Sequence, residues 1–368
     1  GSDNNSLGRE SLHSNTTGAN NVAVGSCALY SNTTGGTNIA IGTCAAVANT
    51  TGSDILVIGK NAYISGTTAA NNTAIGNNSL ACNTSGTDNT AVGLSTMFKN
   101  TSGACNTALG KFALRCNTTG SDNTAVGFCA GMKQTTGDNN TSLGSFALDL
   151  LTTADNNTAI GKSAQSQNTT GARNTSVGVQ SMECVVSGGD NTAMGFCALH
   201  KNISGHNTAF GSCSGMCTTE GTGNVSMGSK ALECNTTGTN NVAIGKNTML
   251  TNLTGDENVA VGRDALDANT TADGNTAIGK AALGISTTGG NNSSVGSYSL
   301  DANTTGINNT AVGVSALGLN TTGSYSVAIG EGALKSANTG GDNTAVGRNA
   351  AQNLVTGTNN FVFGSGSD

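Results

Sequence analysis

One motif, Asn-Thr-Ala-aliphatic-Gly, recurs along the whole chain at a spacing of 17 residues. We number the positions of this repeat from its Asn, so that position five is a Gly, which is present in all 22 copies from Gly8 to Gly364. Every step is 17 residues except the one from Asn191 to Asn207, which is 16. Self-similarity at a fixed short period is typical of a solenoid, in which each repeat forms one coil and stacks on its neighbours. The copies begin at residues 4, 21, 38, 55, 72, 89, 106, 123, 140, 157, 174, 191, 207, 224, 241, 258, 275, 292, 309, 326, 343 and 360.

The residues within each copy favour strands over helices. A helical repeat needs apolar residues at three-and-four spacing, whereas here Thr-Ala-Val is followed at once by Gly. Thr, Val and Ile are strand formers, and Gly and Asn interrupt helices. The sequence therefore predicts an all-β fold: a parallel β-solenoid of about 22 coils with 17 residues per coil, forming a single continuous domain over residues 1–368. We expect one strand over positions one to four of each coil and a second near the Ala-Leu pair at positions eight and nine.

Stacked coils would place like residues above one another, about 4.8 Å apart. The Asn at position one is then expected to form an amide ladder, as identical side chains do in cross-β stacks. The larger aliphatic side chains at positions four and nine are expected to fill the core. Position three, on the opposite face of the strand, is expected to form a smooth outer stripe that could let another chain approach. This stripe would comprise Ala23, Ala40, Ala74, Ala91 and Ala108.

Ten of the 11 cysteines fall at only two repeat positions, seven and eleven. Cysteines at one position of neighbouring coils would have Cα atoms close enough for a disulfide, which would indicate an oxidising, extracellular setting. The alternative is that they are small apolar fillers. The candidate disulfides are Cys27–Cys44 and Cys217–Cys234 at matching positions, and Cys116–Cys129 and Cys184–Cys197 between positions eleven and seven of successive coils.

Asn-Thr-Thr or Asn-Thr-Ser begins at position twelve of many coils and matches the acceptor pattern for N-linked glycans. The simpler interpretation is that Asn, Thr and Gly are turn residues. Repeated Thr also suggests an ice-binding face, but the adjacent Thr at positions thirteen and fourteen would point to opposite sides of a strand. The candidate glycosylation sites are Asn15, Asn32, Asn49, Asn83, Asn100, Asn117, Asn168, Asn235, Asn269, Asn303 and Asn320.

Composition and charge argue against several function classes. The net charge of −6 is spread along the chain, and no basic run is present to meet nucleic-acid phosphates. No apolar stretch approaches the roughly 20 residues that span a bilayer, so we expect no membrane span in this segment. The three His and the scattered Asp form no phased catalytic or metal-ligand pattern. We therefore expect no enzyme activity, no catalytic, cofactor-binding or metal-binding residues and no cofactor.

The motifs NIAIG at residues 38–42, NVAIG at 241–245 and SVAIG at 326–330 resemble the head repeats of trimeric autotransporter adhesins. The longer unit NTAVG-x-x-AL-x-x-NTTG resembles repeats of phage-type tail-fibre proteins. This resemblance implies a left-handed β-roll, commonly trimeric, that acts as a surface fibre or adhesive shaft. We thus expect an extracellular structural protein of a cell or virion surface. Self-association is expected, as a lateral oligomer such as a trimer or as an end-to-end filament, together with a surface glycan or receptor as partner. The alternative function is a ligand-binding solenoid surface for glycans or ice.

Overall fold

The computed structural model describes residues 1–366 and contains 22 short parallel strands, one in each coil. The chain divides into two compact units, Gly1–Gly189 and Asp190–Asp368, and both are built from the same coil. The single continuous domain expected from the repeat therefore stays a prediction. The first unit contains β1 (Asn5–Leu7), β2 (Val22–Val24), β3 (Ile39–Ile41), β4 (Leu56–Ile58), β5 (Thr73–Ile75), β6 (Thr90–Val92), β7 (Thr107–Leu109), β8 (Thr124–Val126), β9 (Thr141–Leu143), β10 (Thr158–Ile160) and β11 (Thr175–Val177). The second unit contains β12 (Thr192–Met194), β13 (Thr208–Phe210), β14 (Val225–Met227), β15 (Val242–Ile244), β16 (Val259–Val261), β17 (Thr276–Ile278), β18 (Ser293–Val295), β19 (Thr310–Val312), β20 (Val327–Ile329), β21 (Thr344–Val346) and β22 (Phe361–Phe363).

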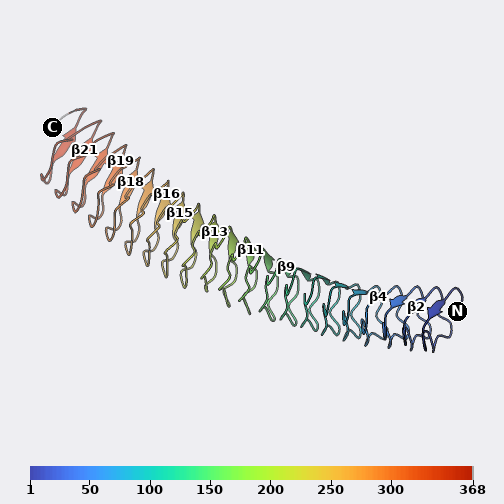
Figure 1. Cartoon of the computed structure of the whole chain (residues 1–368). Coiled ribbons are helices and arrows are strands. Elements are labelled where there is room, and N and C mark those ends of the chain that lie inside the picture. The colour runs from blue at the N-terminus through green and yellow to red at the C-terminus, as the bar shows by residue number, and fades with distance from the viewer. Residues whose placement is uncertain (367–368) are drawn as a thin grey trace. The chain divides into compact units, whose positions relative to one another are not determined.

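Like residues of successive coils lie directly beside one another. In the first unit Val24 of β2 pairs with Ile41 of β3, and Ile41 pairs with Ile58 of β4, all in parallel register. In the second unit Val242 of β15 pairs with Val259 of β16 in the same way. Figure 1 shows the coils of the first unit, coloured blue to green, stacked one beside the next. The predicted parallel β-solenoid with 17 residues per coil is confirmed.

The predicted second strand of each coil is wrong, because positions six to eleven form a turn with a left-handed backbone. In the coil of residues 21–37, Cys27 at position seven has a φ of 58° and Leu29 at position nine has a φ of 50°. A left-handed residue cannot continue a pleated strand, and it costs roughly 1–2 kcal/mol outside glycine. Hydrogen bonds to both neighbouring coils offset this cost. The Cys27 N–H donates to the Arg9 carbonyl at 2.9 Å, and the Leu29 N–H donates to the Ala45 carbonyl at 3.0 Å.

The face of the strand that points into the core is the opposite of the one expected. Ala at position three points into the coil: Ala23, Ala40, Ala74, Ala91 and Ala108 are all fully buried. The predicted outer alanine stripe is therefore wrong, and so is the predicted burial of position four, whose aliphatic side chains point outward. The core is instead made of Ala at positions three and eight and of Leu or Met at position nine, as predicted for that position. Fully buried position-nine residues include Leu29, Leu80, Met97, Leu114, Leu148, Leu232, Met249 and Leu266.

The interior is narrow because two rows of buried asparagine run through it. At position one, Asn21 donates from Nδ2 to the Gly35 carbonyl at 2.9 Å, and its Oδ1 accepts the backbone N–H of Asn38 at 3.0 Å. At position twelve, Asn32 donates from Nδ2 to the same Gly35 carbonyl at 2.9 Å and to Asn15 Oδ1 at 3.0 Å. The position-one row closes each coil and joins it to the next, which confirms the predicted amide ladder. With two amides meeting one carbonyl, positions three and eight hold mainly small side chains: most are Ala or Ser, and Thr96 and Thr248 are buried at position eight.

The position-twelve row is interrupted, and three of the interruptions leave a buried amide oxygen without a hydrogen-bond partner, at Asn49, Asn117 and Asn320. Asn320 Oδ1 is buried without a hydrogen-bond partner, because the next coil has Ala337 at position twelve. We predict that Ala337→Asn extends the row, supplies an Nδ2 donor to Asn320 and raises the free energy of unfolding of the second unit by about 1 kcal/mol. Denaturant titration monitored by circular dichroism measures this change. The matched control is Ala337→Leu, which adds similar volume without a donor; equal stabilisation by both variants would contradict the prediction.

The coil of residues 55–71 lacks both asparagines and replaces them with one tyrosine. Ile55 occupies position one and Gly66 occupies position twelve, while Tyr63 stands at position nine. The fully buried Tyr63 hydroxyl donates to the Ala69 carbonyl at 3.0 Å and accepts Asn72 Nδ2 at 3.2 Å. A Cβ at Gly66 would lie 2.1 Å from the Tyr63 ring, so the glycine provides space for the ring. Burial raises the pKa of Tyr63, which keeps its hydroxyl protonated as a donor.

The 16-residue coil in the second unit has lost position fourteen from its outer turn. Ser204 takes the place of the usual position-fifteen residue, and its carbonyl accepts Nδ2 of both Asn191 and Asn202 at 2.9 Å. The position-one and position-twelve amides of this coil therefore still meet at one carbonyl, as they do in the 17-residue coils that carry both asparagines. Strand register is also kept, with Thr192 of β12 beside Thr208 of β13.

Candidate functional site

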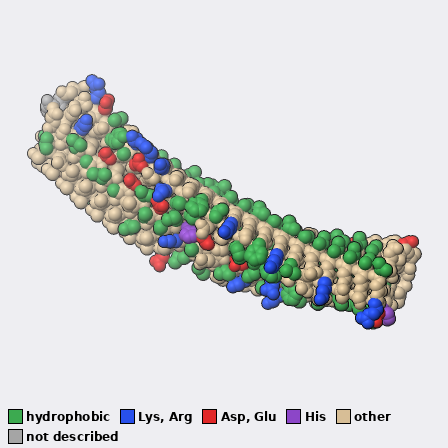
Figure 2. Space-filling model, viewed as in Figure 1, with side chains coloured by type: hydrophobic (Ala, Val, Ile, Leu, Met, Phe, Trp, Pro, Cys, Tyr) green, Lys and Arg blue, Asp and Glu red, His purple; other side chains and the backbone are tan. Residues whose placement is uncertain are grey.

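On the strand side of each coil, the side chains of positions two and four point outward, and none of them is ionisable. Position two is mostly Thr or Val, and position four is aliphatic or Phe in every strand. Figure 2 shows hydrophobic side chains gathered in a row along the strand side of the first unit. We call this surface of positions two and four the strand face. Its exposed position-four side chains include Ile41 39%, Leu109 48% and Leu143 44% in the first unit, and Met194 41%, Met227 41%, Ile278 40% and Ile329 41% in the second.

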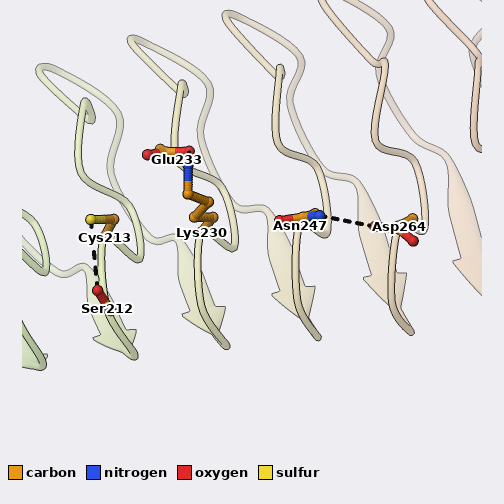
Figure 3. Close-up of polar contacts among 6 residues, drawn as sticks. All are labelled: Ser212, Cys213, Lys230, Glu233, Asn247 and Asp264. Atoms are coloured by element: carbon orange, nitrogen blue, oxygen red, sulfur yellow. Dashed lines mark hydrogen bonds and ion pairs between the residues drawn. The ribbon is translucent and has the colours of Figure 1, made fainter.

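The turn side of each coil, made by positions six, seven, ten and eleven, carries most of the cysteines and charged residues. Figure 3 shows this side in the second unit, where position-seven side chains of four successive coils follow one another. Lys230 and Glu233 form an ion pair of 3.3 Å, and Asn247 donates to Asp264 at 3.1 Å. These pairs are exposed or partly exposed, so each contributes little to stability.

The predicted disulfides are not formed in the structure: none occurs within residues 1–366. The Cys27 thiol donates instead to Glu10 Oε2, 3.6 Å away in the preceding coil. Cys217 and Cys234 are near enough that charge on the Cys217 thiol raises the pKa of Cys234, although burial is the larger cause. Burial likewise raises the pKa of Cys129, which disfavours its thiolate. The alternative of small side chains filling the turn fits Cys129 and Cys197, which are buried. The eight cysteines of the candidate disulfides are Cys27, Cys44, Cys116, Cys129, Cys184, Cys197, Cys217 and Cys234.

The candidate glycosylation sites lie inside the coil rather than on its surface. Asn15 alone among them is partly exposed, and the other ten are fully buried in the position-twelve row. Their Nδ2 atoms, to which a glycan would be attached, donate to the backbone carbonyl three residues later, as in Asn100 to Gly103 at 2.9 Å. A glycan has no room at these atoms in the folded coil, which is a correction to the prediction. The buried sites are Asn32, Asn49, Asn83, Asn100, Asn117, Asn168, Asn235, Asn269, Asn303 and Asn320.

Threonine at position thirteen uses its hydroxyl within the solenoid. Thr33 Oγ1 donates to the Thr50 carbonyl of the next coil at 3.0 Å, and Thr101 Oγ1 donates to the Thr118 carbonyl at 2.9 Å. This row therefore links coils and does not form the regular hydroxyl face that ice binding would need. Regular outward threonine occurs on the strand face instead, at position two of β5 to β11.

Three aspartates at position ten have raised pKa values. Burial is the main cause for Asp149, Asp267 and Asp301, with the charge of Asp264 adding to the effect at Asp267 and that of Lys133 opposing it at Asp149. Oδ1 of Asp149 and Oδ1 of Asp267 are buried without a hydrogen-bond partner. These carboxylates lie on separate coils, and within residues 1–366 no three His, Cys, Asp or Glu side chains are grouped to hold a metal ion. The expected lack of metal, cofactor and catalytic sites stays a prediction.

A cluster of aromatic and cationic side chains on the turn side of the first unit was not predicted from the sequence. Phe112 and Phe146 at position seven flank Phe128 at position six of the coil between them, and Phe98 and Arg115 are at position ten. These residues occupy three different repeat positions, so no single position of the repeat is rich in aromatic residues at this point. The sequence does indicate the cluster by its local concentration of phenylalanine, since four of the eight phenylalanines of the chain occur between residues 98 and 146.

Comparison with known proteins assigns no family to the chain. It matches no protein-family model, and no curated protein is similar enough to match it. None of the residues that the structure describes forms a helix that could cross a bilayer. The resemblance to adhesin and tail-fibre repeats therefore stays an expectation based on the motifs.

Proposed function

We propose that the protein is a structural, extracellular fibre subunit that associates side by side with further copies of itself through the strand face. The observation that carries this proposal is the row of outward aliphatic side chains at position four, which has no charged residue in any strand. Soluble monomers rarely expose contiguous apolar patches larger than roughly a few hundred Å². A row that continues through 11 strands of one unit favours burial against a partner.

The coil architecture supports a mechanical role. Backbone hydrogen bonds, two amide rows and the position-thirteen hydroxyls all join one coil to the next, so the bonding runs through each unit from coil to coil. The strand face is also regular, since every coil presents the same two positions. A second copy offers the same pattern at the same spacing, which makes the face self-complementary.

The test is the oligomeric state of the chain by sedimentation equilibrium. The double variant Leu109→Lys and Leu143→Lys places two charges on the strand face and is expected to raise the dissociation constant about a hundredfold, because an interface would have to desolvate them. The matched control is Thr119→Lys with Thr153→Lys, which adds the same charge to the same two coils at position fourteen, where both residues are exposed. This control is expected to associate like the unmodified chain.

Two results would overturn the proposal. One is an unmodified chain that stays monomeric at tens of micromolar. The other is equal weakening by both double variants, which would reflect net charge rather than the strand face.

Ice binding is a second candidate, because the strand face also presents threonine at position two of the seven strands β5 to β11. In each of these strands an outward threonine alternates with an outward aliphatic side chain across a buried Ala or Ser. A monomeric chain that produced thermal hysteresis, and lost it with Leu109→Lys and Leu143→Lys, would favour this function over self-association.

A further inference from the structure

The aromatic–cation cluster of the first unit consists of Phe98, Phe112, Phe128 and Phe146 with Lys111 and Arg115. The three rings of Phe112, Phe128 and Phe146 form a strip across successive coils. The Phe112 and Phe128 centroids are 6.3 Å apart, and those of Phe128 and Phe146 are 5.2 Å apart in an edge-to-face arrangement. Phe128 and Phe146 are 41% and 36% exposed, so the strip presents ring surface to solvent.

Both cations of the cluster lie against these rings. Lys111 Nζ is 4.9 Å from the Phe112 centroid and 5.9 Å from that of Phe128. Arg115 Cζ is 5.2 Å from the Phe112 centroid and 5.9 Å from that of Phe98. Contact with a ring face holds a cation in place without neutralising it, so its charge and its N–H donors stay available to a ligand.

One N–H donor of the Arg115 guanidinium makes no hydrogen bond within the cluster. Its Nε is buried and has no hydrogen-bond partner in the structure. Burial keeps this atom away from solvent, so a ligand would meet the outer Nη donors of the guanidinium. A carboxylate is the group that guanidinium binds best, through two parallel N–H donors.

The local charge is opposite to that of the chain as a whole. Lys99 and Lys133, both exposed at position eleven, flank the cluster on the turn side, and Asp149 is a carboxylate close to Lys133. Figure 2 shows Lys and Arg side chains among hydrophobic ones on this side of the first unit. A cationic patch on a chain of net charge −6 favours an anionic ligand of limited charge, whereas a nucleic acid would meet repulsion from the remainder of the chain.

We infer that the aromatic–cation cluster binds an acidic glycan, with pyranose rings stacked on the phenylalanine strip and a sugar carboxylate held by Arg115 and Lys111. Aromatic rings offer the apolar face that a sugar ring covers, and the two cations select sugars that carry a carboxylate. The rings follow one another from coil to coil, about 4.8 Å per coil, so an oligosaccharide lying along the coils meets several of them. This inference is independent of self-association, because the cluster lies on the turn side and the strand face on the strand side.

The test is binding of oligogalacturonate to the full chain, measured by titration calorimetry at fixed ionic strength. Arg115→Gln removes the guanidinium and Phe128→Ala removes the central ring, and each is expected to weaken binding about tenfold. Phe128→Tyr keeps a ring and is expected to bind like the unmodified chain. The matched controls are Lys162→Gln, at position six like Lys111, and Phe196→Ala, at position six like Phe128. Both lie outside the cluster and are expected to leave affinity within about twofold.

Three ligand controls decide what is recognised. The same oligosaccharide with its carboxyl groups reduced to alcohols is expected to bind at least tenfold more weakly. Polyglutamate of equal charge tests for binding by charge alone, and oligothymidylate tests for a nucleic-acid site, because aromatic and cationic residues together also bind single strands. The inference is overturned if the unmodified chain does not bind oligogalacturonate, if either other polyanion binds as tightly, or if Lys162→Gln weakens binding as much as Arg115→Gln. Circular dichroism of each variant shows whether the solenoid is intact.

Discussion

Gly110→Ala is expected to lower the free energy of unfolding of the first unit by about 3–5 kcal/mol. Gly110 occupies position five and has a φ of +132°, a backbone conformation that residues with a side chain rarely adopt. A Cβ there would lie 2.5 Å from the Gly127 carbonyl oxygen of the next coil and 2.8 Å from its carbon. Both atoms belong to the backbone, so the two coils would have to separate to admit a methyl group.

The shape of the unfolding curve tests the same point. In a repeat array, stability depends on contacts between neighbouring repeats, so one weakened junction divides the array into parts that unfold separately. We therefore expect a broader or two-step denaturant transition for Gly110→Ala. The matched control is Gly36→Ala at position sixteen, where Ala19, Ala70 and Ala104 stand in other coils. Equal stability of Gly110→Ala and Gly36→Ala would show that the close approach at position five is not a constraint.

Asn106→Ala is expected to cost about 2–4 kcal/mol of the free energy of unfolding, because it removes a fully buried amide from the position-one row. Asn106 Oδ1 accepts the backbone N–H of Asn123 at 3.0 Å, and its Nδ2 donates to the Gly120 carbonyl at 2.8 Å. The Gly120 carbonyl keeps a second donor, Asn117 Nδ2 at 2.9 Å. The main penalty is therefore the N–H of Asn123, which is left buried without an acceptor.

Asn106→Ser is the matched variant, since serine and alanine are nearly equal in size and differ in one hydroxyl. The chain already has a serine at position one in another coil, where Ser326 Oγ accepts the N–H of Asn343 at 3.3 Å. We expect Asn106→Ser to recover about 1–2 kcal/mol relative to Asn106→Ala in denaturant titrations. If the two variants are equally stable, the N–H of Asn123 has found another acceptor and the role assigned to the amide row is wrong.

The repeat alone was sufficient to predict the stacking of coils, the strand at each Thr-Ala-Val and the amide row at position one. These features depend on period and on residue type, and both are visible in the sequence. Which face of the strand points into the core was not predictable in the same way. Val24 and Ile41 are more apolar than Ala23 and Ala40, so hydrophobicity alone places the larger side chains inside. The amide rows decide otherwise, because they occupy the interior and leave space mainly for Ala or Ser at position three.

The turn side was harder to predict for a different reason. Left-handed φ angles at Cys27 and Leu29 have no sequence signal, because neither residue type favours that conformation. The same turn brings Phe98, Phe112 and Phe128 together from three different repeat positions. The Asn-Thr-Thr pattern, in contrast, predicted sites that the structure does not offer. The same tripeptide occurs in exposed glycan acceptors and in turns whose asparagine is buried.

The coil with Ile55, Tyr63 and Gly66 constrains how such a chain can diversify. Its tyrosine needs the space that Gly66 provides, and the Ala69 carbonyl needs the Tyr63 hydroxyl once both asparagines are absent. Glycine at position twelve must therefore precede tyrosine at position nine, and the tyrosine must be present before the last amide donor is lost. The order in which residues of one coil can change is thus set by which group still serves the carbonyl of position fifteen.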